Sequence, residues 1–221
     1  MGHLLKIITA VHQGTKRDYI GRMNNDKIEC MKIARKYGQE YWDGDRKYGY
    51  GGFRYMPGRM EPVAKALIEQ YNLTNESKIL DVGCGKGFLL YEIKQLLPEI
   101  EIHGFDISQY ALDNAKEEIK DKLFIHKAED KYPFKDKEFD LVISLTTLHN
   151  LEVFNLKKAL QEIERVGKHK YIVVEGYRNE AELFNLQCWA LTAKAFFTPE
   201  EWVFLFKEFG YTGDYEFIYF E

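Results

Sequence analysis

The sequence has little cysteine and no long apolar run. Its three cysteines, Cys30, Cys84 and Cys188, are far apart and form no C-x-x-C pair, which argues against a disulfide framework and a structural zinc site. The apolar stretch 4–11 is short, contains Lys6 and leads to no small-residue cleavage site, so we expect neither a signal peptide nor a membrane span. These absences indicate a cytoplasmic protein, and no residue pattern calls for a metal.

An excess of basic residues is also absent. The net charge is −4 and the chain has no long basic run, which disfavours nucleic acid as a substrate. Of the 221 residues, 45% are hydrophobic, enough to bury one full core. Since no internal repeat or low-complexity segment interrupts the chain, a single three-layer α/β domain with an appendage is the economical arrangement.

Residues 78–97 carry the most informative pattern. Residues 78–82 are mostly apolar and predict a buried strand, residues 83–87 contain three glycines at alternate positions, and residues 88–97 resume at helical spacing. Glycine allows a positive φ and a close approach of the backbone to a ligand, while the following helix presents free N–H groups at its N-terminus. This strand, turn and helix together predict a site for a small polar molecule.

The spacing of these glycines narrows the ligand. The loop reads G-x-G-x-G, not the G-x-G-x-x-G of dinucleotide sites, and Asp81 stands two residues before its first glycine. The next predicted strand, 101–105, is followed directly by Asp106. An acid at the carboxyl end of the neighbouring strand can accept hydrogen bonds from both hydroxyls of a ribose. Loop and acid together predict a ligand that contains a ribose.

The same motifs read Leu-Asp-Val-Gly-Cys-Gly-Lys-Gly at 80–87 and Gly-Phe-Asp-Ile-Ser at 104–108, with further motifs at 128–134 and 139–144. In these motifs the sequence resembles the class I S-adenosylmethionine-dependent methyltransferases, over residues 60–221. The resemblance implies an α/β, Rossmann-like fold with a mostly parallel seven-stranded sheet, an antiparallel last strand and flanking helices. It also implies S-adenosyl-L-methionine as cofactor and SN2 transfer of its methyl group.

The resemblance assigns roles to individual residues. In that family the glycine loop lies under the methionine part of the cofactor, the acid after the second strand binds the ribose, and the segment after the third strand lines the adenine. Many members have an aspartate at the position of Ala128, so the adenine contact is expected from the Glu129 backbone or from a displaced carboxylate. Arg59, before the helix 62–71, is expected to pair with the cofactor's carboxylate. The implied cofactor-binding residues are Asp81, Gly83, Cys84, Gly85, Asp106, Ile107, Ala128, Glu129, Ser144 and Arg59.

Residues 37–59 combine many aromatic residues with many glycines. Glycine disfavours regular structure, and exposed aromatic rings are costly, so we expect the segment to fold over something. One interpretation is a lid over the cofactor, because a sulfonium cation is attracted to aromatic faces, with Tyr41 as its main functional residue. The alternative is packing on the outer helices or on a second subunit, which leaves a homodimer open. The residues concerned are Tyr37, Gly38, Tyr41, Trp42, Gly44, Tyr48, Gly49, Tyr50, Gly51, Gly52, Phe53, Tyr55 and Gly58.

The chain is therefore expected to form one structural unit with two parts. Residues 17–37 have amphipathic spacing and predict one or two capping helices. Residues 1–59 would form this helical cap and the aromatic lid. Residues 60–221 would form the domain that binds S-adenosylmethionine.

The acceptor is expected beyond the fourth predicted strand, at 145–150, because ligands bind at the carboxyl ends of parallel strands. His149 lies there and is a candidate general base; the alternative is that it only packs or orders the loop. The helical run 182–191 is either a wall of the acceptor pocket or an ordinary helix at the sheet edge. The Asn/Asp-Pro-Pro-aromatic motif of enzymes that methylate base amino groups is absent.

We therefore predict a methyltransferase that acts on a small-molecule acceptor, with no nucleic-acid or membrane partner. Two other classes stay open at this point. One is an enzyme on the same fold that uses S-adenosylmethionine without methyl transfer. The other is a regulatory protein that binds the cofactor and does not consume it.

Overall fold

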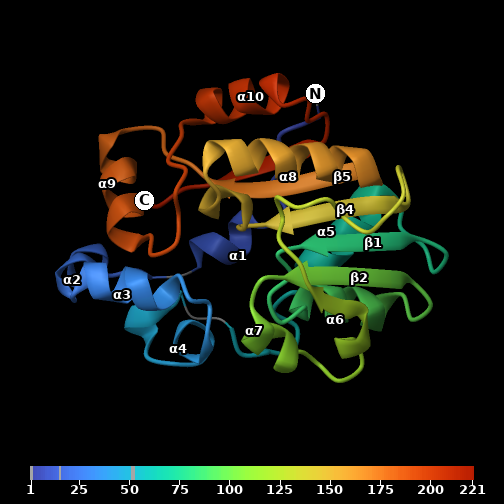
Figure 1. The fold of residues 1–221 in the computed structure, drawn as a ribbon, viewed down its shortest axis with the longest axis horizontal. Helices are drawn as coiled ribbons and strands as arrows, with labels where there is room; N and C mark the ends of the chain where they lie inside the picture. The colour runs from blue at the N-terminus through green and yellow to red at the C-terminus, as the bar shows by residue number, and fades with distance from the viewer. Residues whose placement is uncertain (1, 15, 51–52) are drawn as a thin grey trace.

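The computed structural model describes residues 2–14, 16–50 and 53–221, so Gly51 and Gly52 of the predicted lid lie outside the described residues. Within these ranges six strands form one parallel sheet in the order β3-β2-β1-β4-β5-β6 (Figure 1). All the strands run the same way, so their carboxyl ends meet at one edge of the sheet. The strands are β1 (Lys78–Val82), β2 (Glu101–Asp106), β3 (Leu123–Ile125), β4 (Phe139–Leu145), β5 (Gly167–Glu175) and β6 (Asp214–Ile218).

Helices cover both faces of the sheet and one of its edges. A capping box at Thr198 and Glu201, with a proline at the first helical position, begins α10. None of the helices in the described residues is long and apolar enough to cross a membrane. The helices are α1 (Thr9–Gln13), α2 (Tyr19–Asn24), α3 (Lys27–Ala34), α4 (Gln39–Trp42), α5 (Glu61–Tyr71), α6 (Phe88–Leu96), α7 (Gln109–Asp113), α8 (Val153–Val166), α9 (Glu180–Trp189) and α10 (Pro199–Glu208), with short 3-10 turns at η1 (Arg46–Tyr48), η2 (Lys120–Lys122) and η3 (Leu148–Asn150).

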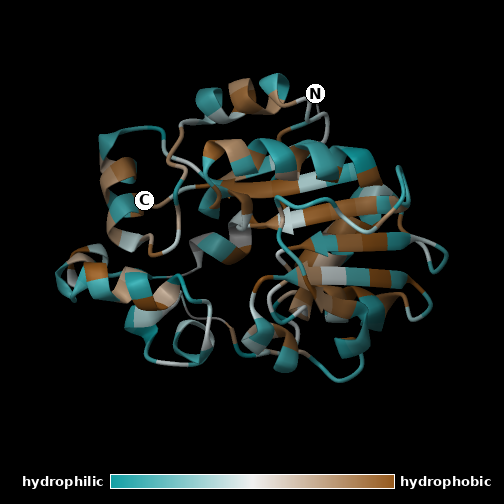
Figure 2. Cartoon of the chain, in the orientation of Figure 1, coloured by the Kyte–Doolittle hydropathy of each residue, from teal (hydrophilic) through white to brown (hydrophobic). Residues whose placement is uncertain are grey.

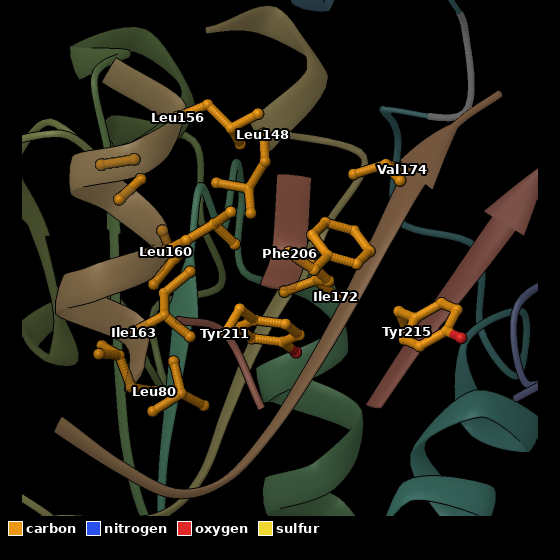
Figure 3. Packing of buried hydrophobic residues seen from close by; sticks show 14 of the residues in the cluster. Leu80, Leu148, Leu156, Leu160, Ile163, Ile172, Val174, Phe206, Tyr211 and Tyr215 are labelled. Carbon is orange, nitrogen blue, oxygen red and sulfur yellow. The ribbon is translucent and has the colours of Figure 1, made fainter. Parts of the chain in front are cut away.

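Alternate residues of each strand build two separate cores. Leu80, Val142 and Ile172 face α8 and α10, whereas Ile79 and Leu141 face α5 and α6, because successive side chains of a strand point to opposite faces. Figure 3 shows the first core, with side chains of α8 and β5 pointing toward one another. Hydrophobic residues are concentrated along the strands (Figure 2). This burial on both faces gives the strands their nearly continuous apolar sequence.

The prediction of seven strands with an antiparallel last strand is wrong for the described residues. The last strand, β6, pairs in parallel with β5, with Tyr171 opposite Asp214. The chain reaches β6 through α9 and α10, and a helical crossover returns the chain to the end where β5 starts, so β6 runs parallel. An antiparallel last strand would instead require a hairpin.

The beginning of the chain lies at the outer edge of β6. Leu4 forms an isolated parallel bridge with Tyr215. The buried carboxylate of Glu216 accepts hydrogen bonds from the backbone N–H groups of Ile7, Ile8 and Thr9 and from the Thr9 hydroxyl. It therefore satisfies free N–H groups at the start of α1. The apolar stretch 4–11 covers the sheet edge.

The region before the first strand is largely helical. Helices α2 and α3 fall within the predicted span 17–37, and α2–α4 lie beyond the carboxyl ends of the strands, with α2 next to α9 and α4 next to α7 (Figure 1). Arg22 joins the cap to α9, because its guanidinium lies 4.1 Å from the centre of the Trp189 ring and donates to the Trp189 carbonyl. It also donates to the carbonyls of Arg46 and Gly49.

Candidate functional site

A cavity of about 570 Å³ lies where the strands end and the cap begins. Its size is in the usual range for small-molecule sites. One wall comes from the glycine loop and from the residues that follow β2, β3 and β4. The other comes from residues between 35 and 42 and between 53 and 60, and from Thr192 and Lys194. The topology thus brings the predicted ribose acid and the predicted aromatic lid to the same space.

The glycine loop is closely packed on both sides. Gly83 and Gly85 have φ values of +77° and +55°, which glycine adopts at little cost. A Cβ on Gly83 would lie 2.3 Å from the Thr147 side chain, and a Cβ on Gly85 would lie 2.8 Å from the Trp42 ring. The ring of Trp42 therefore places the cap directly against the loop.

Asp106 and Asp81 form the acidic end of the cavity. Asp106 accepts hydrogen bonds from the backbone N–H groups of Gly85 and Ser108, both at 2.9 Å, one on each oxygen. Each of its oxygens keeps a second lone pair. Asp81 Oδ1 is buried and has no hydrogen-bond partner among the described residues. Burial, with a contribution from Asp106, raises the pKa of Asp81 to about 8.

These two carboxylates fit S-adenosylmethionine. Asp106 has free lone pairs for two ribose hydroxyls, and the unpartnered oxygen of Asp81 lacks a donor or cation, which the amino group and the sulfonium of the cofactor could supply. Burial also raises the pKa of Asp106, although hydrogen bonds from the backbone N–H groups of Ser108, Gly85 and Ile107 oppose the shift. A cation bound beside the pair would lower the pKa of both acids.

Other predicted cofactor residues also lie on the cavity wall. Ile107, Ala128 and Glu129 line it beyond the ends of β2 and β3. Arg59 lines it from the cap side, where its guanidinium donates to the Met56 sulfur. Cys84 lines it as well, but burial raises the pKa of its thiol well above the usual value, so the thiol is not an activated nucleophile.

Ser144 does not line the cavity. Its side chain is fully buried, and its hydroxyl donates to the Val82 carbonyl at 2.9 Å. This bond ties β4 to β1 under the site. Ser144 is the sixth residue of β4, one before the strand ends, and it lies on the same face of the strand as the buried Val142.

His149 is also not among the cavity residues. Its ring is buried; Nδ1 accepts from the Glu175 backbone N–H at 3.2 Å, and Nε2 lies 3.4 Å from the Glu175 carboxylate. Burial lowers the pKa of His149 to about 3. Its carbonyl accepts from the backbone N–H groups of Lys194 and Ala195. This placement disagrees with the prediction of a general base and agrees with the alternative that His149 orders the loop.

Tyr41 does line the cavity. Its ring is almost fully buried and lies within 6 Å, centre to centre, of the rings of Tyr37, Trp42, Tyr50 and Phe53. Burial is the main cause that raises its pKa well above the usual value. The phenol is therefore neutral at physiological pH and can donate or accept a hydrogen bond, but it is not a phenolate base.

Only part of the aromatic segment faces the cavity. Tyr37, Tyr41, Trp42, Phe53 and Tyr55 line it. The hydroxyl of Tyr50 instead accepts from the backbone N–H groups of Leu191 and Thr192 and so holds the chain that follows α9. The two interpretations of the segment, lid and packing, therefore apply to different residues.

Residues 182–191 were predicted to be either a wall of the acceptor pocket or an ordinary packed helix. Helix α9 packs its Leu186 and Trp189 against the cap, which agrees with an ordinary packed helix. The wall of the cavity is formed by Thr192 and Lys194, just after it. The helix thus positions the wall without forming it.

Three site residues were not predicted from the sequence. The Asp43 carboxylate accepts from the Lys86 ammonium at 2.7 and 2.8 Å and from the Tyr110 hydroxyl at 2.9 Å, which links the cap to the glycine loop. Asn150 lines the cavity, and its Oδ1 has no hydrogen-bond partner among the described residues. For Asn150 a signal was present, because it ends the predicted acceptor segment. For Asp43 and Lys86 none was, because their pairing depends on how the cap docks.

The fold and the site define an α/β protein with a cavity at the carboxyl ends of its strands that fits a ribose-containing cofactor. The family model for the methyltransferase domain matches residues 73–209, which is more than half of the chain. The protein therefore belongs to the methyltransferase domain family, and it is an S-adenosylmethionine-dependent methyltransferase.

Individual relatives are distant. The chain is similar to the demethylmenaquinone methyltransferase of Thermotoga maritima, with 25% identity over 183 residues, 71% of this chain and 79% of the relative. It is 33% identical over 131 residues to the mitochondrial arginine-hydroxylase NDUFAF5 of Mus musculus, covering 58% of this chain but only 37% of that protein. Among solved structures, the YcgJ protein from Bacillus subtilis has a TM-score of 0.54 at 20% identity, over 66% of each chain. This last likeness shows the fold.

Proposed function

We propose that this methyltransferase acts on a small-molecule acceptor that binds in the cavity between the glycine loop and the cap. One observation carries the proposal. The same cavity contains the acids at the strand ends and, opposite them, an aromatic wall that the chain supplies from its own cap. A cavity of about 570 Å³ whose two walls come from the same chain favours a small acceptor.

The cofactor would occupy the glycine-loop end. The backbone of the loop at Gly83 and Gly85 would lie against its methionine part, Asp106 would accept from the ribose, and Asp81 would face its positive charge. Ile107, Ala128 and Glu129 flank the adenine, and Arg59 pairs with the carboxylate. When bound, S-adenosylmethionine supplies an electrophilic methyl group on a sulfonium and becomes S-adenosylhomocysteine on transfer.

The cap, within residues 1–59, would act as the lid. Trp42 already packs over Gly85, and the pairing of Asp43 with Lys86 holds it there. The rings of Tyr37, Tyr41 and Phe53 can face a cation and exclude water. Transfer between aligned reactants needs little beyond this positioning.

The acceptor would lie beside Asn150 and Tyr41. The unpartnered Asn150 Oδ1 is an acceptor without a donor among the described residues, so a hydroxyl or N–H of the acceptor molecule is its natural partner. The Tyr41 hydroxyl, which is neutral because of its raised pKa, would donate to the acceptor and orient it.

Calorimetric titration with S-adenosylhomocysteine tests the cofactor site. Asp106→Asn keeps the shape of the side chain but removes the charge, and we expect it to weaken binding about 10–100-fold, because two charge-assisted hydrogen bonds are lost. Asp113→Asn, an exposed acid on the neighbouring α7, is the matched control and should bind as the wild type does. Equal affinity of wild type and Asp106→Asn would refute the assigned ribose contact.

A screen of small molecules tests the acceptor. The purified protein is incubated with S-adenosylmethionine and candidate acceptors, and S-adenosylhomocysteine is measured. Production that depends on a small molecule supports the proposal. Production that occurs only with a protein or nucleic acid as acceptor contradicts it.

A further inference from the structure

A second cavity adjoins the first at two cationic residues. It has a volume of about 540 Å³ and lies between α3 and the residues around α9. Arg35 and Lys194 line both cavities. Arg35 follows α3 in the cap, whereas Lys194 lies in the segment that His149 and Tyr50 hold in place. The two side chains thus come from separate parts of the fold to the junction of the cavities.

The cations at this junction lack strong partners. Arg35 has no carboxylate within ion-pair distance in the described part of the chain. Lys194 pairs only with Glu152, at 3.2 Å, and both side chains are exposed, at 42% and 68%. Such an exposed pair contributes little. Lys27 adds a third cation in the second cavity, and its ammonium donates to the carbonyls of Cys188 and Ala190.

Cations outnumber acids along the walls of both cavities. Asp81, Asp106 and Glu129 lie at the cofactor end, and no acid lines the second cavity except Glu152, among the described residues. Arg54 and Lys127 add further positive charge to the wall of the first cavity. This excess of cations occurs in a protein whose net charge is −4. The sulfonium of the cofactor would add one more positive charge, which would repel a cationic acceptor and attract an anionic one.

We propose that the acceptor is an organic anion whose carboxylate or phosphate binds between Arg35 and Lys194. Its methyl-accepting group would lie in the first cavity, near Asn150, and any larger remainder would extend into the second cavity toward Lys27. Arginine suits this task because its guanidinium matches the geometry of carboxylate and phosphate oxygens. The inference rests on the proposed function and adds the charge class of the acceptor.

Three para-substituted phenols of similar size and different charge test the preference. They are 4-hydroxybenzoate, 4-hydroxybenzamide and 4-hydroxybenzylamine, each titrated by calorimetry into the protein saturated with S-adenosylhomocysteine. We expect the anion to bind about tenfold more tightly than the neutral amide and the amine to bind most weakly, since one charge-assisted contact corresponds to about that factor. Inorganic pyrophosphate is titrated in parallel. A preference for it over the benzoate would identify phosphate, and the reverse order would identify carboxylate.

Charge-removing variants locate the anion. Arg35→Gln and Lys194→Gln should each weaken the preferred anion about tenfold. Lys32→Gln is the matched control. Lys32 lies in the last turn of α3, and Arg35 directly follows that helix. Lys32 carries the same charge as Arg35 but lines neither cavity. It should bind the anion as the wild type does. An equal loss in all three variants would mean that only net charge matters, and this would overturn the assigned site.

The outcome also separates this inference from the proposed function. If S-adenosylhomocysteine does not bind to the folded wild-type protein, the proposed function fails. If it binds but the anionic, neutral and cationic probes bind equally, or none of them binds, only the charge class of the acceptor is overturned.

Discussion

Replacement of Asp81 by asparagine should stabilise the cofactor-free protein and reduce the dependence of its stability on pH. Asp81 is 5% exposed, and one of its oxygens has no partner in the described residues. Burial, followed by the charge of Asp106, raises its pKa from 3.8 to about 8. In the unfolded chain this carboxyl has its ordinary pKa. Folding therefore takes up a proton between about pH 4 and pH 8, and the stability present below this window is lost as the pH rises through it.

The size of the effect follows from the pKa shift. Each pKa unit corresponds to about 1.4 kcal/mol, so the shift of about four units limits the loss to about 6 kcal/mol above pH 8. Because Asp81 and Asp106 titrate together, we expect a smaller change, about 2–4 kcal/mol between pH 5 and pH 8. Asp81→Asn removes this part of the pH dependence and leaves that of Asp106.

Urea unfolding at pH 5 and pH 8, without cofactor, measures the effect. The free energy of unfolding of Asp81→Asn should exceed that of the wild type by more at pH 8 than at pH 5. Asp130→Asn, at an exposed acid nearby, should follow the wild type at both values. Saturating S-adenosylhomocysteine should stabilise the wild type more than the variant. An identical difference between Asp81→Asn and the wild type at both pH values would refute the assigned pKa shift.

Three further changes test the packing of the site. Gly83→Ala should cost about 1–3 kcal/mol in urea unfolding and abolish S-adenosylhomocysteine binding, since its φ is +77° and its Cβ would lie 2.3 Å from Thr147; wild-type stability would contradict the loop geometry. Asp43→Asn should cost about 1–3 kcal/mol, because Lys86, which is 6% exposed, loses its counterion. The cap should then be cleaved faster in limited proteolysis, and an unchanged rate would count against the link. His149→Gln should lower stability but keep the shape of the pH profile of activity, because the pKa of His149 is already lowered to about 3. If the variant instead lost an inflection near pH 6.5, the ordinary pKa of histidine, this would support His149 as the general base.

The local elements of the cofactor site were readable from the sequence. The strand at 78–82 and the glycine loop occur where the motifs predicted them, and the predicted ribose acid, Asp106, is the last residue of β2. Each depends on neighbours in the chain: alternating burial on a strand, positive φ at glycine, and the position where a strand ends. The family could be inferred for the same reason, because its motifs are short and contiguous.

The side-chain directions around β4 were not readable in this way. Ser144 and His149 are both near the end of β4, yet Ser144 bonds to the backbone of β1 and His149 points to Glu175 of β5. Their direction depends on which strands flank β4 and on where the chain turns after it. A pattern of residue types does not contain this information.

What the sequence determined by itself was the parallel α/β core, the identity of the cofactor-binding loop and the existence of a helical cap. The number and direction of the edge strands depended on tertiary structure, because α9 and α10 return the chain parallel to β5 and residues 3–5 occupy the free edge of β6. The docking of the cap also depended on it. Asp43 pairs with Lys86, more than 40 residues further along the chain. Arg35 and Lys194, more than 150 residues apart, line the same two cavities. Contacts of this range arise only when distant segments pack together, so the acceptor end of the site is a property of the folded protein.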